Sequence, residues 1–139
     1  MNFEQHVNEY LKTIESTAKY RDFDVSSIED DGPSLVIYRL MSKQQCDACN
    51  VLVLPGTAVY GLFYAEFCLY LNEQGFNVYT LEYRGHGQSE WERGNYSLDE
   101  LVGGTQRLID RVQAEQKGPL YLLAPVRAGY CPILYRCGR

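Results

Sequence analysis

The sequence predicts an α/β domain with a mostly parallel sheet. Three short apolar runs, at residues 51–54, 76–83 and 120–123, have the hydrophobicity of strands that are buried on both faces. Helix-length segments at 61–74 and 98–116 separate these runs, and such alternation favours right-handed crossovers between parallel strands. The 139 residues are a usual size for one domain, so residues 1–139 are expected to form a single unit.

Three further elements precede the first of these runs. Residues 1–20 are expected to contain an amphipathic packing helix over residues 3–20. Residues 22–33, DFDVSSIEDDGP, predict a strand followed by an acidic turn. Residues 34–41, SLVIYRLM, are apolar and rich in β-branched side chains, which is typical of a strand. The apolar face of the first helix consists of Phe3, Val7, Tyr10, Leu11 and Ile14.

The two predicted helices carry end signals. Gly75 follows the first and is a suitable C-terminal cap residue. Ser97 and Glu100 have the spacing of a capping box at the start of the second. Gly103 and Gly104 weaken that second helix by about 1 kcal/mol each relative to alanine, so its N-terminal half is the less favourable part.

Composition and charge exclude several classes of protein. The formal charge of −5 provides no basic footprint for nucleic acid. No apolar run reaches membrane-spanning length, and the polar N-terminus lacks the basic start and apolar core of a secretory signal. A cytoplasmic protein without a cofactor is therefore expected.

The five cysteines do not form a recognisable metal site. Cys46 and Cys49 are a lone CxxC pair, and structural zinc would need two more ligands nearby. Cys68 falls within a predicted helix, and Cys131 and Cys137 lie far away. With an odd number and no secretory signal, we expect reduced thiols and no metal.

Two loops combine features of a catalytic α/β fold. Leu54-Pro55-Gly56-Thr57 directly follows a buried strand, and a glycine there permits a sharp turn that exposes backbone N–H groups to a developing oxyanion. Arg84-Gly85-His86-Gly87-Gln88-Ser89 follows the next strand, and two glycines flanking a histidine make a tight turn. Each alone is an ordinary loop; their pairing at this spacing is the specific signal.

Residues 34–123 resemble the lysophospholipase and monoacylglycerol-lipase branch of the α/β-hydrolases, also described as serine-aminopeptidase-like. That family has a Gly-aromatic-x-Val strand followed by Asp-x-Arg-Gly-His-Gly-x-Ser. This chain has Gly75-Phe76-Asn77-Val78 and then Glu82-Tyr83-Arg84-Gly85-His86-Gly87-Gln88-Ser89. The resemblance implies the N-terminal half of an α/β-hydrolase fold, and acyl-serine hydrolysis of a small acyl ester or a lipid-like ester.

The resemblance also implies residue roles. The N–H of Thr57 or Ala58 would be an oxyanion donor, in a loop that begins at Gly56. His86 would structure its loop and would not be the catalytic base. The same structural loop includes Arg84, Gly85, Gly87 and Ser89. This chain departs from the family pattern at two positions: Pro55 replaces a histidine of the oxyanion loop, and Glu82 replaces the aspartate of the Asp-x-Arg-Gly-His-Gly-x-Ser motif. Neither change removes a catalytic group, because the oxyanion donors are backbone N–H groups.

A third departure removes the nucleophile. The strand LYLL should lead into Gly-x-Ser-x-Gly, the elbow that presents the catalytic serine. These positions read Ala124-Pro125-Val126-Arg127-Ala128-Gly129, with Val126 in the serine position. The chain ends at Arg139, before the family's acid and base, and the only histidine besides His86 is His6. The sequence therefore predicts no catalytic residue in this chain.

The genetic code suggests an origin for residues 124–139. When the codons from Leu123 to Gly129 are read from the third base of the preceding codon, the triplets permit Gly-x-Ser-x-Gly-Gly in the expected register. The other alternative frame cannot supply the first glycine. Residues 124–139 are therefore interpreted as an aberrant, out-of-frame tail.

Three functional hypotheses follow. The chain is a catalytically incomplete relative of serine ester hydrolases, an enzyme with another nucleophile such as Cys131, or a non-catalytic interaction or lipid-binding module on a hydrolase scaffold. With no later strands beside it, the strand at 120–123 would be an exposed apolar edge, through which copies of the chain would associate.

Overall fold

The computed structural model describes residues 5, 22–43, 48–56, 59–124 and 133–137. The helix expected at 3–20 lies outside the described residues apart from Gln5. The other expected helices and strands are confirmed. They are β1 (Asp24–Glu29), β2 (Ser34–Leu40), β3 (Asn50–Val53), the short 3₁₀ helix η2 (Gly61–Tyr64), α2 (Ala65–Glu73), β4 (Asn77–Leu81), α3 (Leu98–Glu115) and β5 (Leu120–Ala124), and one unexpected strand follows, β6 (Ile133–Cys137).

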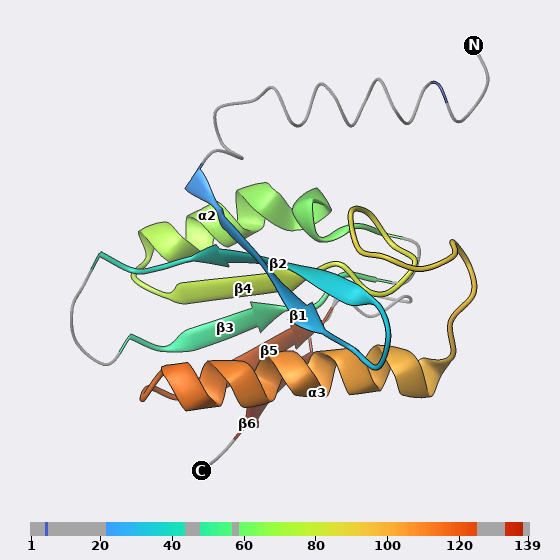
Figure 1. Ribbon diagram of the computed structural model, residues 1–139. Coiled ribbons are helices and arrows are strands. Elements are labelled where there is room, and N and C mark those ends of the chain that lie inside the picture. The colour runs from blue at the N-terminus through green and yellow to red at the C-terminus, as the bar shows by residue number, and fades with distance from the viewer. Residues whose placement is uncertain (1–4, 6–21, 44–47, 57–58, 125–132, 138–139) are drawn as a thin grey trace.

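The strands form one sheet of six, in the order β1-β2-β4-β3-β5-β6 (Figure 1). Its centre is parallel, because β3 pairs in parallel with both β4 and β5. Antiparallel strands flank this centre, with β1 and β2 on one side and β6 on the other. The parallel pairing expected for the three apolar runs is confirmed, and the sheet as a whole is mixed.

Strand β5 is not an edge of the sheet. It pairs with β6 from Leu120 opposite Cys137 to Ala124 opposite Ile133. The expectation of an unpaired edge at 120–123 is therefore wrong. The physical reason lies in the segment ILYRC at 133–137, whose β-branched and aromatic residues suit a strand, and an open edge pairs with such a segment. Association of copies through this part of the sheet stays a prediction.

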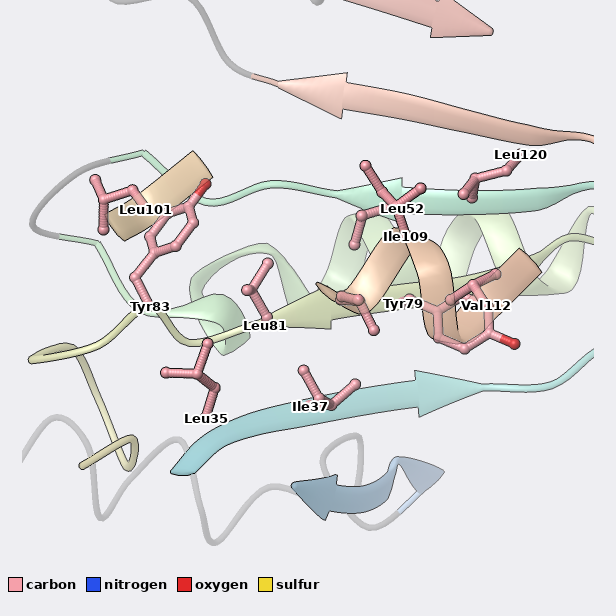
Figure 2. Close-up of a cluster of buried hydrophobic side chains, with 11 residues drawn as sticks. Leu35, Ile37, Leu52, Tyr79, Leu81, Tyr83, Leu101, Ile109, Val112 and Leu120 are labelled. Carbon is pink, nitrogen blue, oxygen red and sulfur yellow. The ribbon is translucent and has the colours of Figure 1, made fainter. Parts of the chain in front are cut away.

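Each face of the sheet is covered by a different helix, and each has its own core (Figure 1). Figure 2 shows the core under α3, where Leu52, Leu81 and Leu120 from three strands meet Ile109 and Val112. The opposite face packs Val51, Val53 and Val78 against Ala65 and Cys68 of α2. Alternate residues of one strand thus serve the two cores, so the central strands are apolar at nearly every position.

The helix ends match their sequence signals. Ser97 Oγ accepts a hydrogen bond from the N–H of Glu100, and the Glu100 carboxylate accepts one from the N–H of Ser97. Gly75 has a φ of +99°, a conformation that glycine adopts without the Cβ strain of other residues. No helix in the described part of the chain is long and apolar enough to cross a bilayer.

Candidate functional site

The two loops singled out in the sequence lie at the same edge of the sheet. Val53 is in register with Thr80 of β4 and with Leu123 of β5, so the three parallel strands end at about the same level. The loop that contains Gly56 follows β3, and the loop at 82–96 follows β4. The carboxyl ends of parallel strands are where open α/β sheets bind their ligands.

The loop after β3 is tied to β5 at its base. The N–H of Leu54 donates to the carbonyl oxygen of Leu123 at 2.8 Å. Gly56 then accepts a hydrogen bond from the N–H of Val59 at 3.2 Å, which closes a tight turn. Thr57 and Ala58, the expected oxyanion donors, lie outside the described residues. Their role stays a prediction.

The loop after β4 is organised around Glu82. This side chain is 2% exposed, and its carboxylate accepts a hydrogen bond from the N–H of Gln88. Gly87 has a φ of +49°, and a Cβ at that position would collide with the Glu82 carboxylate. A glycine is therefore needed where the loop crosses the carboxylate.

Burial sets the protonation behaviour of Glu82. Desolvation raises the pKa of its carboxyl group above the ordinary value of 4.5. Smaller, opposing effects come from the Gln88 N–H, the Tyr38 side chain and the positive charge of Arg93. Burial outweighs these effects, so the pKa of Glu82 remains raised and the surroundings disfavour its ionised form.

Ser89 closes the same loop onto β2. Its hydroxyl donates to the carbonyl oxygen of Glu82 at 2.5 Å and accepts from the N–H of Val36 at 2.8 Å. The hydroxyl is therefore occupied on both sides. Ser89 is also buried, at 9% exposure, and the contacts of its hydroxyl hold the loop against β2.

Arg84 links three separate parts of the chain. Its Nη2 donates to the carbonyl oxygen of Asp30 at 2.9 Å and to the Asp30 carboxylate at 3.0 Å. Its Nη1 contacts the carboxylate of Glu100, at the start of α3, at 2.8 Å. The guanidinium also lies 5.0 Å from the ring centre of Trp91. Arg84 thereby joins the β1–β2 turn, the loop after β4 and α3.

His86 is enclosed by aromatic rings. It is 6% exposed, and its Nδ1 lies 2.9 Å from the carbonyl oxygen of Arg84. Its ring lies 5.7 Å from that of Tyr83 and 4.8 Å from that of Tyr96. Gly85, which precedes it, has a φ of +71° and lies against the carbonyl oxygen of Glu92, where a Cβ would not fit. These contacts fit the expected loop-structuring role, which itself stays a prediction.

Sequence reasoning missed the partners of Arg84. The sequence places Asp30 in an acidic turn and carries no signal at Trp91. Trp91 has a φ of +112°, which is rare for a bulky residue. A buried arginine requires an anion, but nothing in the sequence indicates which of several acidic residues supplies it.

The position expected for the nucleophile lies outside the described residues. Strand β5 ends at Ala124, two residues before Val126. Among the described residues there is no group of three His, Cys, Asp or Glu side chains that could hold a metal ion. Cys49 and Cys68 are free thiols, and burial raises the pKa of Cys68 to about 12, which makes it a poor nucleophile.

The fold is that of several solved hydrolases. A monoglyceride lipase from Saccharomyces cerevisiae superposes with a TM-score of 0.62 at 14% identity, over 80% of this chain and 35% of the lipase. The ferulic acid-bound Est1E from Butyrivibrio proteoclasticus gives 0.63 at 19% identity, over 71% and 41%. The epoxide hydrolase VrEH1 from Vigna radiata gives 0.61 at 21% identity, over 76% and 32%.

The chain thus spans about a third to two fifths of the length of these structures. No curated protein matches it. The family profile described as "Serine aminopeptidase, S33" matches residues 46–125, which include both loops and the strands β3, β4 and β5. This match covers more than half of the sequence, and the chain therefore belongs to the serine aminopeptidase S33 family of α/β-hydrolases.

Proposed function

We propose that this chain carries the oxyanion-loop side of an acyl-serine hydrolase for carboxylic esters, of the lysophospholipase or monoacylglycerol-lipase type, and that the chain itself hydrolyses no ester. One observation carries this proposal. The family match ends at residue 125, and the next position, where the family's elbow needs serine, is Val126. An isopropyl side chain has neither a nucleophilic atom nor a proton to give to a base.

The arrangement of the strand ends supports the class of chemistry. Acyl transfer needs a nucleophile and N–H donors on the same carbonyl group. The turn at Gly56 follows β3 and is hydrogen-bonded at its base to β5, the strand that leads to position 126. Donors at 57 or 58 and a nucleophile at 126 would therefore come from neighbouring strands.

The substrate class rests on the family. A small acyl ester or lipid-like ester is the expected substrate of a complete enzyme of this branch. The alternative of a non-catalytic interaction or lipid-binding module predicts binding of the same class of molecule without turnover.

The test is an esterase assay on the purified chain with p-nitrophenyl butyrate and a fluorophosphonate probe. The expected result is hydrolysis no faster than by the heat-unfolded chain, and no site-specific labelling. Covalent labelling of one defined serine would overturn the proposal. Turnover that Cys131→Ala abolishes would overturn it in favour of a cysteine nucleophile.

A further inference from the structure

Strand β1 is an outer strand of the sheet. The strand order begins with it, and within the described ranges its only neighbour in the sheet is β2. Most of its side chains are exposed, and Val25 is 64% exposed. An outer strand presents backbone N–H and C=O groups with which a strand of another chain pairs, so the open side of β1 is a surface for association.

The register decides which residues of β1 offer backbone groups to this open side. The N–H of Asp30 donates to the carbonyl oxygen of Pro33 at 2.9 Å, so these two residues form a hydrogen-bonded pair at the turn. Hydrogen-bonded and non-hydrogen-bonded pairs alternate along an antiparallel ladder, and the ladder runs without interruption through β1. The residues whose N–H and C=O groups point away from β2 are therefore Val25, Ser27 and Glu29.

Strand β2 agrees with this assignment. Val36 lies opposite Ser27 in the register. Its N–H donates to Ser89 Oγ, and its carbonyl oxygen accepts from the N–H of Glu82. Both backbone groups of Val36 thus face the loop after β4, on the side of β2 that is remote from β1. Ser27 and Val36 do not exchange hydrogen bonds, and the backbone of Ser27 faces outward.

Arg111 of α3 occupies the middle of the open side. Its Nη1 donates to the carbonyl oxygen of Ser27 at 3.0 Å. Its Nε contacts Oε1 of Glu115, one turn later in the same helix, at 3.1 Å, which holds the guanidinium in this position. A hydrogen bond from a charged donor is shorter and stronger than one between neutral groups. A strand that approached β1 would therefore find its central acceptor already taken.

Two copies of the chain would otherwise be able to pair through β1. In an antiparallel arrangement about a two-fold axis at Ser26, Val25 of one copy lies opposite Ser27 of the other, and Asp24 lies opposite Ile28. No two carboxylates face each other in this register, so charge does not prevent the pairing. Each hydrogen-bonded pair within β1 joins Val25 to Ser27 and needs the Ser27 carbonyl oxygen, the acceptor that Arg111 holds.

We propose that Arg111 closes the outer edge of β1 and thereby keeps a second copy of the chain from extending the sheet there. Natural sheets commonly block their outer strands with charged side chains, which prevents association from edge to edge. Here the charge comes from a helix on the face of the sheet, and it acts on one carbonyl group of the strand.

The experiment compares Arg111→Met with Lys117→Met by light scattering and sedimentation velocity. Methionine keeps an unbranched apolar stem and removes the guanidinium, whereas Lys117 is exposed just beyond α3 and its substitution removes the same charge. A contact of a few exposed hydrogen bonds has a dissociation constant on the order of 1 mM, so the weight-average mass of Arg111→Met should be about 1.5 times that of wild type at about 1 mM. Lys117→Met should keep the wild-type mass.

A second substitution tests where the copies pair. The N–H of Ser27 faces the open side, so Ser27→Pro removes a donor for the second copy without removing a hydrogen bond to β2. Combined with Arg111→Met, it should return the mass to that of wild type. Thermal melting followed by circular dichroism shows whether each variant is folded, and Arg111→Gln is a second variant with the same expected effect.

Four results would overturn the proposal. One is an Arg111→Met chain with the wild-type mass at every concentration. Another is an equal rise in mass for Lys117→Met, because the lost charge is then the cause. The third is a rise that Ser27→Pro leaves unchanged, because the copies then associate elsewhere. The fourth is loss of cooperative melting in both Arg111 variants, because the guanidinium then serves the fold itself.

Discussion

Arg84 and Asp30 are 54 residues apart in the sequence, yet Arg84 Nη2 lies 3.0 Å from Asp30 Oδ2, and each side chain is only 5% exposed. The pair connects the turn between β1 and β2 with the family loop after β4. Arg107 of α3 adds a second contact to Asp30 at 3.0 Å. The loop that identifies the family is therefore held by an acidic residue that lies outside the family motif.

Removal of the Asp30 charge should destabilise the domain strongly. Asp30→Asn leaves the buried Arg84 guanidinium with only the more exposed Glu100 carboxylate as its anion, and removing one partner of a buried ion pair costs roughly 3–5 kcal/mol. Asp24→Asn is the matched control, because Asp24 pairs with Arg39 while 66% exposed, and an exposed pair contributes less than about 1 kcal/mol. Urea unfolding followed by circular dichroism measures both. Equal losses in the two variants would contradict this assignment.

Glu82 should give the fold a distinct pH dependence. Burial raises its folded-state pKa above the ordinary 4.5, so the folded chain holds this proton more tightly than the unfolded chain does. The resulting stabilisation is fully present below the unfolded pKa and is lost as the pH rises through the folded pKa. Above that pH, the buried ionised carboxylate lowers the free energy of unfolding relative to its value at low pH.

Glu82→Gln removes this titration and keeps an oxygen that can accept the Gln88 N–H. The stability of the variant relative to wild type should therefore increase between pH 4.5 and pH 8. Thermal melting across this range provides the measurement, and Glu73→Gln on the exposed surface of α2 controls for the loss of one carboxylate. A stability difference that falls as the pH rises would refute the prediction.

Gly103 and Gly104 should respond oppositely to alanine. Nothing lies within 4 Å of a Cβ built at Gly103, so Gly103→Ala should stabilise α3 by roughly 0.5–1 kcal/mol. At Gly104 a Cβ would lie 2.9 Å from Leu35 Cδ1 and 3.4 Å from Asp30 Oδ2, so Gly104→Ala should destabilise by roughly 1–3 kcal/mol. The two variants control for each other in one denaturation series, and the same sign for both would be inconsistent with the packing.

The source DNA should carry a second reading frame at codon 123. Inserting one nucleotide there is expected to open a frame with Gly-x-Ser-x-Gly-Gly, a helix, and later an aspartate and a histidine. Protein made from that frame should label with a fluorophosphonate at the new serine, and its Ser→Ala variant should not. A genomic read with a stop after codon 139 and no such downstream frame would dispose of this idea.

Much of this fold could be predicted from the sequence, because the features concerned depend on residues that are close together in the chain. The apolar runs at 51–54 and 120–123, the capping box from Ser97 to Glu100 and the cap at Gly75 depend on neighbours in the chain, and all are confirmed. The pairing of the Gly56 loop with the loop at 84–89 was enough to place the chain in its family. These features need only helical or strand periodicity and turn geometry, which act over a few residues.

Other features depend on segments that meet only after folding. The sequence could not indicate that β5 pairs with β6, that Asp30 is the anion for Arg84, or that Gly104 makes room for Leu35. Gly103 and Gly104 looked equally unfavourable, and the structure separates them because only one faces β2. For a charged side chain or a strand edge, many partners that are distant in the sequence are possible. Only the packing of the folded chain decides which of them comes into contact.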